Sequence, residues 1–591
     1  MRTFSKLVPI SAIAALLVAG GPATGAARDL TGLWAAKHAT NTVDVRGPLL
    51  IQRVAGGWRA QISGQSAPVA FEGTSVSFAL PGGKGRFDGR LLSDTTISGF
   101  WTQPRTVDAG TPYASPVTLI KDGPDVWKGT VTPLDDGMTF YLRIASPVNT
   151  ADSSTSKATL FNPQRDLGWQ WDVDRIVRHG DSARLLASAA GRNKGQDEAD
   201  GAYHSDDDVL SFYFSGRGGT YDFTRVAANA PSDFYPRGRP NAPYLYAPPP
   251  DEHDGWRVGN VSDVGISQTR IDAFVRRLID TPMDSVHSPQ IHALLIARHG
   301  KLVVEEYFHG WNRDMPHDPR SASKSVTSTL FGAAILAGLP VSPSTPVYSA
   351  MNGGAFPAGL DPLKRSMTVE SLLTMSSGLD CDDNDPASPG NEETMLENAT
   401  DYYRFALGLK TIRPPGQEAV YCSIQPNLVG GVLARTTHRS LQDLFQDLVA
   451  QPMQISHYYM SLQPTGEPYM GGGLRFMPRD FMKFGQLLMD GGVWNGHRIL
   501  SKEWSEKSTS AITYLAQYKS KYGYLWWVED LRYKGGTVRA FSMLGNGGQD
   551  VVAIPQLDLI IETFAGNYGD RVSHIILSHY IPDDILPAVT R

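Results

Sequence analysis

The sequence predicts a multidomain protein in which an N-terminal all-β sandwich or barrel is followed by an α+β domain. The chain has 591 residues, too many for one hydrophobic core. Residues 28–227 consist of short runs of alternating apolar and polar residues separated by turn residues, which is typical of antiparallel sheets. After residue 255, helical and strand patterns follow one another to the C terminus.

Composition excludes some classes of partner. The chain is 41% hydrophobic and 19% charged, and its net charge of -6 leaves no basic surface for nucleic acid. We therefore expect no nucleic-acid partner. The 59 glycines and 40 prolines predict many turns, in agreement with extensive β structure.

The first 27 residues have the layout of a secretory signal peptide. Arg2 and Lys6 precede an apolar run, and small residues follow it, so we expect cleavage near Ala26 or Ala27. The apolar run contains Pro9 and is short for a membrane span, and no later stretch approaches the roughly 20 apolar residues that a spanning helix needs. The sequence predicts a secreted or periplasmic protein with no stable membrane span.

Residues 28–227 are expected to form an accessory domain for binding or docking. Runs such as VSFAL, TTISGFWTQ and VLSFYFSG have the period-two alternation of strands. Ser154 and Lys157 repeat the spacing of a catalytic serine and lysine, but a polar surface loop explains them better. Residues 228–254 are expected to be an extended linker, because residues 228–250 contain seven prolines.

Residues 255–591 are predicted to form an α+β domain, because their first elements are a helix and a hairpin. The stretch SQTRIDAFVRRLID predicts a helix behind a Ser267 cap, and residues 291–310 predict a hairpin that turns at His299 and Gly300. The helix is expected to bury one apolar face, made of Ile271, Phe274, Val275, Leu278 and Ile279.

The stretch SASK opens the next predicted helix and brings Ser321 and Lys324 onto one side of its first turn. The helix dipole favours a serine nucleophile there, and a lysine amine held neutral by a crowded site takes the serine proton. The alternative is a helix cap followed by a solvated lysine. The apolar face of this helix is predicted to hold Val326, Leu330, Ala334 and Ala337.

Two further segments give the SASK motif a context. Tyr421 and Ser423 stand in the stretch YCS, about a hundred residues downstream, and the stretch GNGGQ follows near the C terminus. With these three elements in this order, residues 255–585 resemble the serine hydrolase superfamily of class C β-lactamases, DD-peptidases and related esterases and amide hydrolases. The resemblance implies a β-lactamase/transpeptidase-like fold, with an antiparallel sheet flanked by helices and a helical subdomain.

The resemblance also implies roles for individual residues. Ser321 would be the nucleophile, and Lys324 and Tyr421 would share the role of general base. The N–H groups of Ser321 and Gln549 would form the oxyanion hole. No metal or organic cofactor is implied. Substrate binding would fall to Ser423, Asn546, Gly547 and Gly548. Taken alone, Tyr421 also fits a core aromatic residue, and GNGGQ also fits a plain hairpin turn.

Two departures from the superfamily pattern bear on the substrate. Ser423 replaces the asparagine of the penicillin-recognising members, and Asn546 replaces their lysine or histidine, so a cation suited to a substrate carboxylate is missing from the third motif. The sequence therefore favours a small ester, amide or peptide substrate, as in enzymes resembling the 6-aminohexanoate-dimer hydrolases. A cell-wall DD-peptidase or β-lactamase is one alternative, and a non-catalytic ligand-binding protein on the same fold is another.

The remaining polar clusters have simpler explanations. Cys381 and Cys422 either pair in an oxidising compartment or remain two buried thiols. Asp380, Asp382, Asp383 and Asp385 lie in one stretch but lack the spacing of an EF-hand, which favours a loop of solvated acids at the substrate rim over a calcium site. The histidines invite a Ser/His/Asp triad, but the chain has no GxSxG motif, and we expect surface or packing roles for His292, His299, His309 and His317.

Overall fold

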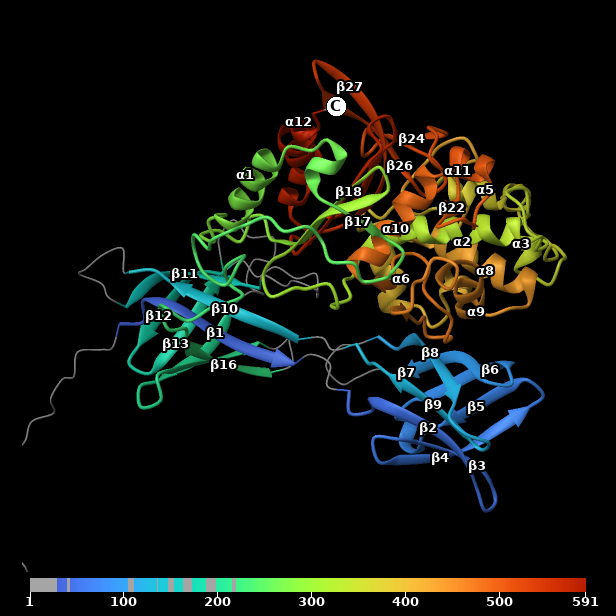
Figure 1. Ribbon diagram of the computed structural model, residues 1–591, viewed down its shortest axis with the longest axis horizontal. Helices are drawn as coiled ribbons and strands as arrows, with labels where there is room; N and C mark the ends of the chain where they lie inside the picture. The colour runs from blue at the N-terminus through green and yellow to red at the C-terminus, as the bar shows by residue number, and fades with distance from the viewer. Residues whose placement is uncertain are drawn as a thin grey trace, which may run out of the picture.

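The computed structural model describes residues 29–39, 43–104, 111–134, 137–146, 154–162, 173–187, 198–214 and 219–590. The predicted signal peptide lies outside these ranges. Figure 1 shows two β-rich bodies built from the N-terminal part of the chain, beside a larger body of mixed helices and strands. The predicted order of an all-β part followed by an α+β part is confirmed.

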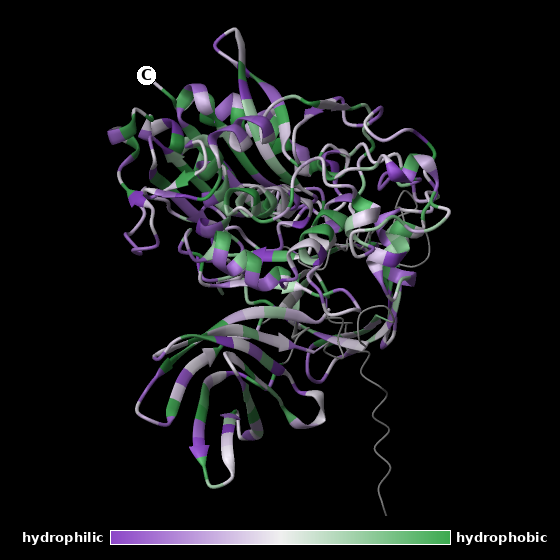
Figure 2. Ribbon diagram, turned by 90° about the vertical axis from the view of Figure 1, so that its right-hand side faces the viewer, coloured by the Kyte–Doolittle hydropathy of each residue, from purple (hydrophilic) through white to green (hydrophobic). Residues whose placement is uncertain are grey.

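The first β-rich body is a closed antiparallel barrel, so the barrel is the correct one of the two predicted forms. Apolar and polar residues alternate along its strands, and the apolar side chains fill the interior. Figure 2 shows the same alternation along the strands of the other β-rich body, which lies nearest the viewer there. Trp34 and Phe212 are among the fully buried side chains there. Its strands are β1 (Gly32–Ala39), β10 (Gly137–Ile144), β11 (Thr155–Phe161), β12 (Val173–His179), β13 (Ser182–Ala187), β14 (Ala199–His204), β15 (Val209–Phe214) and β16 (Gly219–Arg225).

The second β-rich body is inserted between β1 and β10. Each of its strands pairs with the next in antiparallel fashion, and the last strand pairs with both the first and the one before it, which closes the ring. Its core contains Phe87 and Trp101. Its strands are β2 (Gly47–Val54), β3 (Gly57–Ile62), β4 (Gln65–Glu72), β5 (Ser75–Ala79), β6 (Arg86–Ser93), β7 (Thr96–Gln103), β8 (Tyr113–Lys121) and β9 (Val126–Val131).

The second barrel is joined to the α+β domain by a strand pairing. Strand β20 (Tyr458–Ser461) pairs with β8 on one side and with β21 (Leu474–Phe476) on the other. The ring of Tyr113 packs against that of Tyr459, with centroids 5.5 Å apart, and Arg90 forms an ion pair with Asp447. The barrel sheet therefore continues into the α+β domain.

The proline-rich segment 228–254 lies on the α+β domain and has no regular strand or helix of its own. Tyr246 is buried, and its hydroxyl donates to Val303 O at 2.8 Å. Arg237 forms an ion pair with Glu306, which lies on the same strand as Val303. The segment contains turns between residues 228 and 241, and it packs along the domain surface.

A nine-stranded sheet forms the centre of the α+β domain. The predicted hairpin is present, with His299 and Gly300 in the left-handed backbone region at its turn. In spatial order the strands are β17 (Arg257–Val258), β19 (Lys301–Tyr307), β18 (Ile291–Arg298), β29 (Leu559–Ala565), β28 (Gln549–Ile554), β27 (Gly536–Gly545), β26 (Trp527–Tyr533), β25 (Ser520–Tyr522) and β24 (Thr513–Leu515).

Helices cover both faces of this sheet. The predicted first helix is α1 (Gln268–Ile279), and it packs on one face with η8 (Ile576–Ile585) and α12 (Leu586–Ala588). All five apolar residues predicted for its buried face are buried. On the opposite face lies α10 (Pro478–Met489), followed by a helical subdomain (Figure 1). Elements of that subdomain include α5 (Val369–Leu373), α6 (Glu392–Asn398), α7 (Tyr402–Gly408), α8 (Ile424–Thr437), α9 (Leu441–Phe445), η5 (Gln446–Ala450) and α11 (Lys502–Ser508).

Helix α2 (Lys324–Leu336) lies inside this body. Every residue from Lys324 to Ala334 is buried, so the helix is enclosed on all sides, whereas one buried face was predicted. Val326, Leu330 and Ala334 are in the core, but Ala337 lies just beyond the helix end and is exposed. Gly332 permits close packing, since a Cβ there would lie 2.2 Å from Trp504 Nε1. The periodicity of the segment could not reveal that its polar face is also covered.

Candidate active site

Ser321 lies in η4 (Arg320–Ser323), the short 3-10 turn that leads into α2. The residue before it, Arg320, has a left-handed backbone with φ of 50°. Asp318 supports this turn, because its Oδ1 accepts the Arg320 N–H at 2.9 Å. Strained backbone of this kind persists where the surroundings hold it, often at functional sites. The turn leaves Ser321 partly exposed at the end of a buried helix.

Lys324 is a buried amine in contact with the serine. Its side chain is 1% exposed, and its Nζ lies 2.7 Å from Ser321 Oγ. Burial lowers the pKa of Lys324 from its ordinary value, against the opposing charges of Glu392 and Asp383. The alternative of a helix cap followed by a solvated lysine does not fit this geometry.

Tyr421 completes the group. It is buried beside Lys324, whose Nζ lies 5.2 Å from the centre of the tyrosine ring, and its side chain is hydrogen-bonded to Ser321. Trp527 stacks on the same ring at 5.5 Å, and Tyr518 meets its edge. Burial raises the pKa of Tyr421 well above its ordinary value. The structure therefore brings together the three predicted catalytic residues.

The turn between β27 and β28 lies against η4. A Cβ built on Gly545 would lie 2.1 Å from Pro319 O and 3.1 Å from Ala322 N, so the end of β27 reaches the turn that carries Ser321. Gln549, the first residue of β28, is fully buried, and its side chain donates to Ala565 O at 2.6 Å. This places the 545–549 turn beside Ser321, where the resemblance predicted an oxyanion hole.

Gly547 and Gly548 are required by packing behind the turn. Both have left-handed backbone, with φ of 101° and 93°. A Cβ on Gly547 would lie 2.7 Å from the Tyr568 ring, and one on Gly548 would lie 3.0 Å from Ile576. Their missing side chains thus face the protein, whereas the sequence suggested a close approach of substrate. Asn546 is exposed, and its Oδ1 accepts the Gly569 N–H at 2.8 Å.

Gly545→Ala is expected to lower the rate of reaction at Ser321 by on the order of 100-fold, because the added Cβ would lie only 2.1 Å from Pro319 O and so forces the turn that carries Ser321 to shift. The rate of covalent labelling of Ser321 measures this. Gly536→Ala is the control on the same strand, since its nearest neighbour is Tyr533 O at 3.9 Å. Equal rates for the two variants would contradict the prediction.

Ser423 is fully buried, and its contacts are with a loop acid. Asp383 Oδ2 accepts both the Ser423 hydroxyl at 2.6 Å and the Ser423 N–H at 2.7 Å. The hydroxyl proton of Ser423 is therefore committed to Asp383, although the sequence suggested contact with substrate. Asp383 itself belongs to the loop that was predicted to be solvated, and its place in the site was missed. The only signal was its position two residues after Cys381.

Known proteins are similar to the part of the chain that holds these residues. The sequence model of the Beta-lactamase family matches residues 275–567. The 6-aminohexanoate-dimer hydrolase of Paenarthrobacter ureafaciens is 26% identical over 311 residues, which is 49% of this chain and 76% of that protein. Residues 275–567 form a domain of the beta-lactamase family.

Solved structures similar to this beta-lactamase-family domain include hydrolases with several descriptions. EstCE1, a hydrolase with promiscuous acyltransferase activity, is 17% identical with a TM-score of 0.42, over 55% of this chain and 98% of its own. A family VIII carboxylesterase is 18% identical with a TM-score of 0.41, over 51% of this chain and 92% of its own. The domain is a hydrolase domain of the beta-lactamase fold, and the N-terminal barrels lie outside the matched residues.

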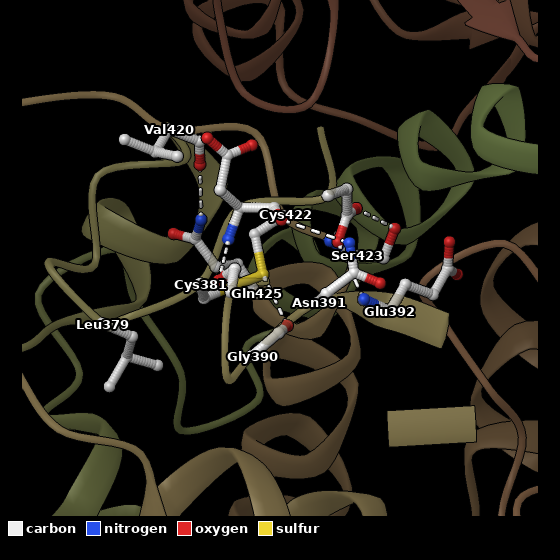
Figure 3. Close-up of a disulfide and its surroundings, with 12 residues drawn as sticks. Leu379, Cys381, Gly390, Asn391, Glu392, Val420, Cys422, Ser423 and Gln425 are labelled. Atoms are coloured by element: carbon white, nitrogen blue, oxygen red, sulfur yellow. Dashed lines mark hydrogen bonds between the residues drawn. A yellow bond between two sulfur atoms is a disulfide. The ribbon is translucent and has the colours of Figure 1, made fainter. Parts of the chain in front are cut away.

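The beta-lactamase-family domain contains a disulfide beside its candidate active site. Cys381 and Cys422 are bonded, with Cα atoms 6.0 Å apart, and Ser423 and Glu392 lie next to the bond (Figure 3). Cys422 directly follows Tyr421. The bond therefore ties the loop that carries Asp383 to the segment that carries Tyr421, the predicted catalytic tyrosine.

Replacing both Cys381 and Cys422 by alanine is expected to lower the free energy of unfolding of this domain by about 4 kcal/mol, because the bond closes a loop with a sequence separation of 41. Urea denaturation measures this, with labelling of Ser321 as the probe of the folded domain. The two single variants are expected to behave like the double variant, since each also lacks the bond. An unchanged urea midpoint in the double variant would contradict the prediction.

Other candidate residues in the chain have structural roles. His292, His309 and His317 are buried, and burial lowers the pKa of His317 to about 3 and that of His309 to about 4. His317 stacks on Phe564 and so acts in packing. Lys157 lies in β11, and Ser154 is the turn residue just before that strand.

The residues that the structure describes also bear on metal binding and on membrane insertion. Within these ranges, no three His, Cys, Asp or Glu side chains come together in a group suited to a metal ion. Over the same part of the chain, no helix combines the length and apolar character needed to cross a bilayer.

Proposed function

We propose that the domain is a serine hydrolase that cleaves an ester or amide through an acyl-enzyme on Ser321. The observation that carries this proposal is the buried Lys324 amine 2.7 Å from Ser321 Oγ, on a turn that leaves the serine partly exposed. A nucleophile and a base within hydrogen-bond reach are what covalent acyl transfer needs.

Lys324 and Tyr421 divide the proton transfers between them. Burial lowers the pKa of Lys324 and raises that of Tyr421, which favours a neutral amine and a neutral phenol. The neutral amine accepts the Ser321 proton as Oγ attacks the carbonyl carbon. The proton then passes to the leaving oxygen or nitrogen, with Tyr421 as the donor next to it, and the bond between carbonyl carbon and leaving group breaks.

The 545–549 turn supports the other requirement of acyl transfer. The N–H groups of Ser321 and Gln549 are proposed to bind the oxyanion, since β27 packs directly on η4 and β28 begins at Gln549. Deacylation reverses the proton transfers, with water in the place of the leaving group. The new carboxylic acid is released, and Ser321 regains its proton.

The charges of the site favour a substrate without a carboxylate near the scissile bond. Asp383 and Glu392 both act on Lys324, and the third motif contributes the neutral Asn546, whose Oδ1 already accepts the Gly569 N–H. An ester or amide fits these surroundings better than a β-lactam does. The relative named 6-aminohexanoate-dimer hydrolase supports an amide as one such substrate.

Two covalent probes test this function. The purified protein is treated with a fluorophosphonate and, separately, with a fluorescent penicillin, and any adduct is mapped by mass spectrometry. We expect a fluorophosphonate adduct on Ser321 and none with penicillin. A penicillin adduct on Ser321 would favour the cell-wall enzymes, and the absence of any adduct would favour a binding protein and overturn the proposal.

We also propose that the protein is exported. The pattern of residues 1–27 supports a signal peptide. The disulfide between Cys381 and Cys422 supports the same conclusion, because such bonds persist in oxidising compartments.

A further inference from the structure

Asp383 is hydrogen-bonded to both ends of the Tyr421–Ser423 segment, which contains the proposed catalytic tyrosine. Its backbone N–H donates to Tyr421 O at 3.1 Å. Its Oδ2 accepts the Ser423 N–H at 2.7 Å and the Ser423 hydroxyl at 2.6 Å. Asp383 is thus hydrogen-bonded to the residues on both sides of Cys422. Cys422 itself is bonded to Cys381.

The second oxygen of Asp383 is also engaged. Its Oδ1 accepts the N–H of Glu392, the first residue of α6, at 3.1 Å. Glu392 in turn accepts a hydrogen bond from the buried Tyr469 hydroxyl. The Asp383 carboxyl group therefore links the disulfide loop, the tyrosine segment and α6 in a single place.

Charge connects this carboxyl group to the nucleophile. Asp383 and Glu392 both favour the ammonium form of Lys324, and both disfavour the ionised form of Tyr421. The other titratable groups that act on Asp383 or Lys324 are the phenols of Tyr469 and Tyr518. Burial, and then the charge of Glu392, raise the pKa of Asp383 to about 6.

We propose that Asp383 is a positioning residue for the acylation of Ser321, which holds the Tyr421–Ser423 segment in place and sets the pH range of the reaction through its charge on Lys324. This inference rests on the proposed function. It assigns to the disulfide loop a part in the chemistry, in place of the passive rim expected from its run of acids. The acid acts through Lys324 and Tyr421 and does not itself touch the substrate.

The test is the pH dependence of fluorophosphonate labelling at Ser321 in the wild-type protein and in Asp383→Asn. The asparagine Oδ1 can still accept hydrogen bonds from Ser423, but the negative charge is lost. Without this charge, deprotonation of Lys324 or of Tyr421 becomes easier. In a plot of labelling rate against pH, the rising limb is therefore expected to move to lower pH by about 1 unit. Because both groups move in the same direction, the result does not depend on which of them is the base.

Two further variants make the outcome decisive. Asp385→Asn removes the same charge from an exposed position of the same loop and is expected to keep the wild-type limb. Asp383→Glu keeps the charge and is expected to retain the wild-type limb at a lower labelling rate, because its longer side chain displaces the Ser423 contacts. If Asp383→Asn does not fold, a limb moved by a full unit or an unchanged labelling rate in Asp383→Glu overturns the proposal, and an unmoved limb at a lower labelling rate supports it.

The remaining outcomes are equally distinct. An unmoved limb in Asp383→Asn, or an equal movement in Asp383→Asn and Asp385→Asn, overturns the role of Asp383. A wild-type protein that does not label at Ser321 at any pH overturns the proposed hydrolase function instead.

Discussion

Ser321→Ala is expected to abolish fluorophosphonate labelling and to lower kcat by on the order of 10⁴- to 10⁶-fold. The loss is large because the variant lacks the atom to which the acyl group bonds, while Lys324 and Tyr421 then have no proton to accept or return. Stability is expected to change little, since Ser321 is partly exposed and its hydroxyl contacts only the catalytic pair.

Ser154→Ala provides the matched control, because Ser154 shares the spacing to a lysine but lies at the start of a barrel strand. Its labelling and turnover are expected to equal those of the wild-type protein. An adduct that survives in Ser321→Ala, mapped by mass spectrometry, would show that another residue is the nucleophile.

Lys324→Met is expected to lower kcat/KM by on the order of 10²- to 10⁴-fold, since general-base catalysis contributes about this much. Folding stability is expected to be retained, because a buried amine without a carboxylate partner in direct contact is replaced by an apolar side chain of similar length. Thermal denaturation and steady-state kinetics measure the two effects separately.

Lys483 is a second buried lysine, and its replacement is expected to lower stability without lowering activity. Its Nζ lies 2.6 Å from Asp480 Oδ1 and donates to Gln454 O at 3.0 Å, away from Ser321. Lys483→Met leaves Asp480 buried without its partner, so a loss of about 3 kcal/mol in unfolding free energy is expected, with kcat of the folded protein unchanged. If Lys324→Met loses stability but keeps its activity, Lys324 is a structural residue and the assignment of the base is wrong.

The secondary structure around the site was predictable because its signals are local. The apolar face of α1 follows from a 3.6-residue period, and the hairpin of β18 and β19 follows from two strand patterns around His299 and Gly300. The alternation in residues 28–227 likewise indicated strands. It did not indicate two separate barrels, because alternation shows which face of a strand is apolar and does not show which strand is its neighbour.

The contacts within the proposed catalytic group were only partly predictable. Ser321 and Lys324 are three residues apart on one helix start, so their contact follows from local geometry. Tyr421 required the order of motifs along the chain. Ser423 and Asp383 are 40 residues apart, and their hydrogen bond exists only because the loop folds back onto the start of α8.

The sequence by itself determined the fold class, the order of the all-β and α+β parts, and the Ser321 and Lys324 pair, because short-range periodicity and spacing encode these features. The tertiary structure alone decided the insertion of the second barrel, the burial of Lys324 and Ser423, and the place of Asp383. The physical reason is that burial and the charge on a neighbouring group are set by chain segments distant in sequence. These long-range contacts partly bury Asp383, which the sequence suggested was solvated, and bring its charge close enough to affect the pKa of Lys324.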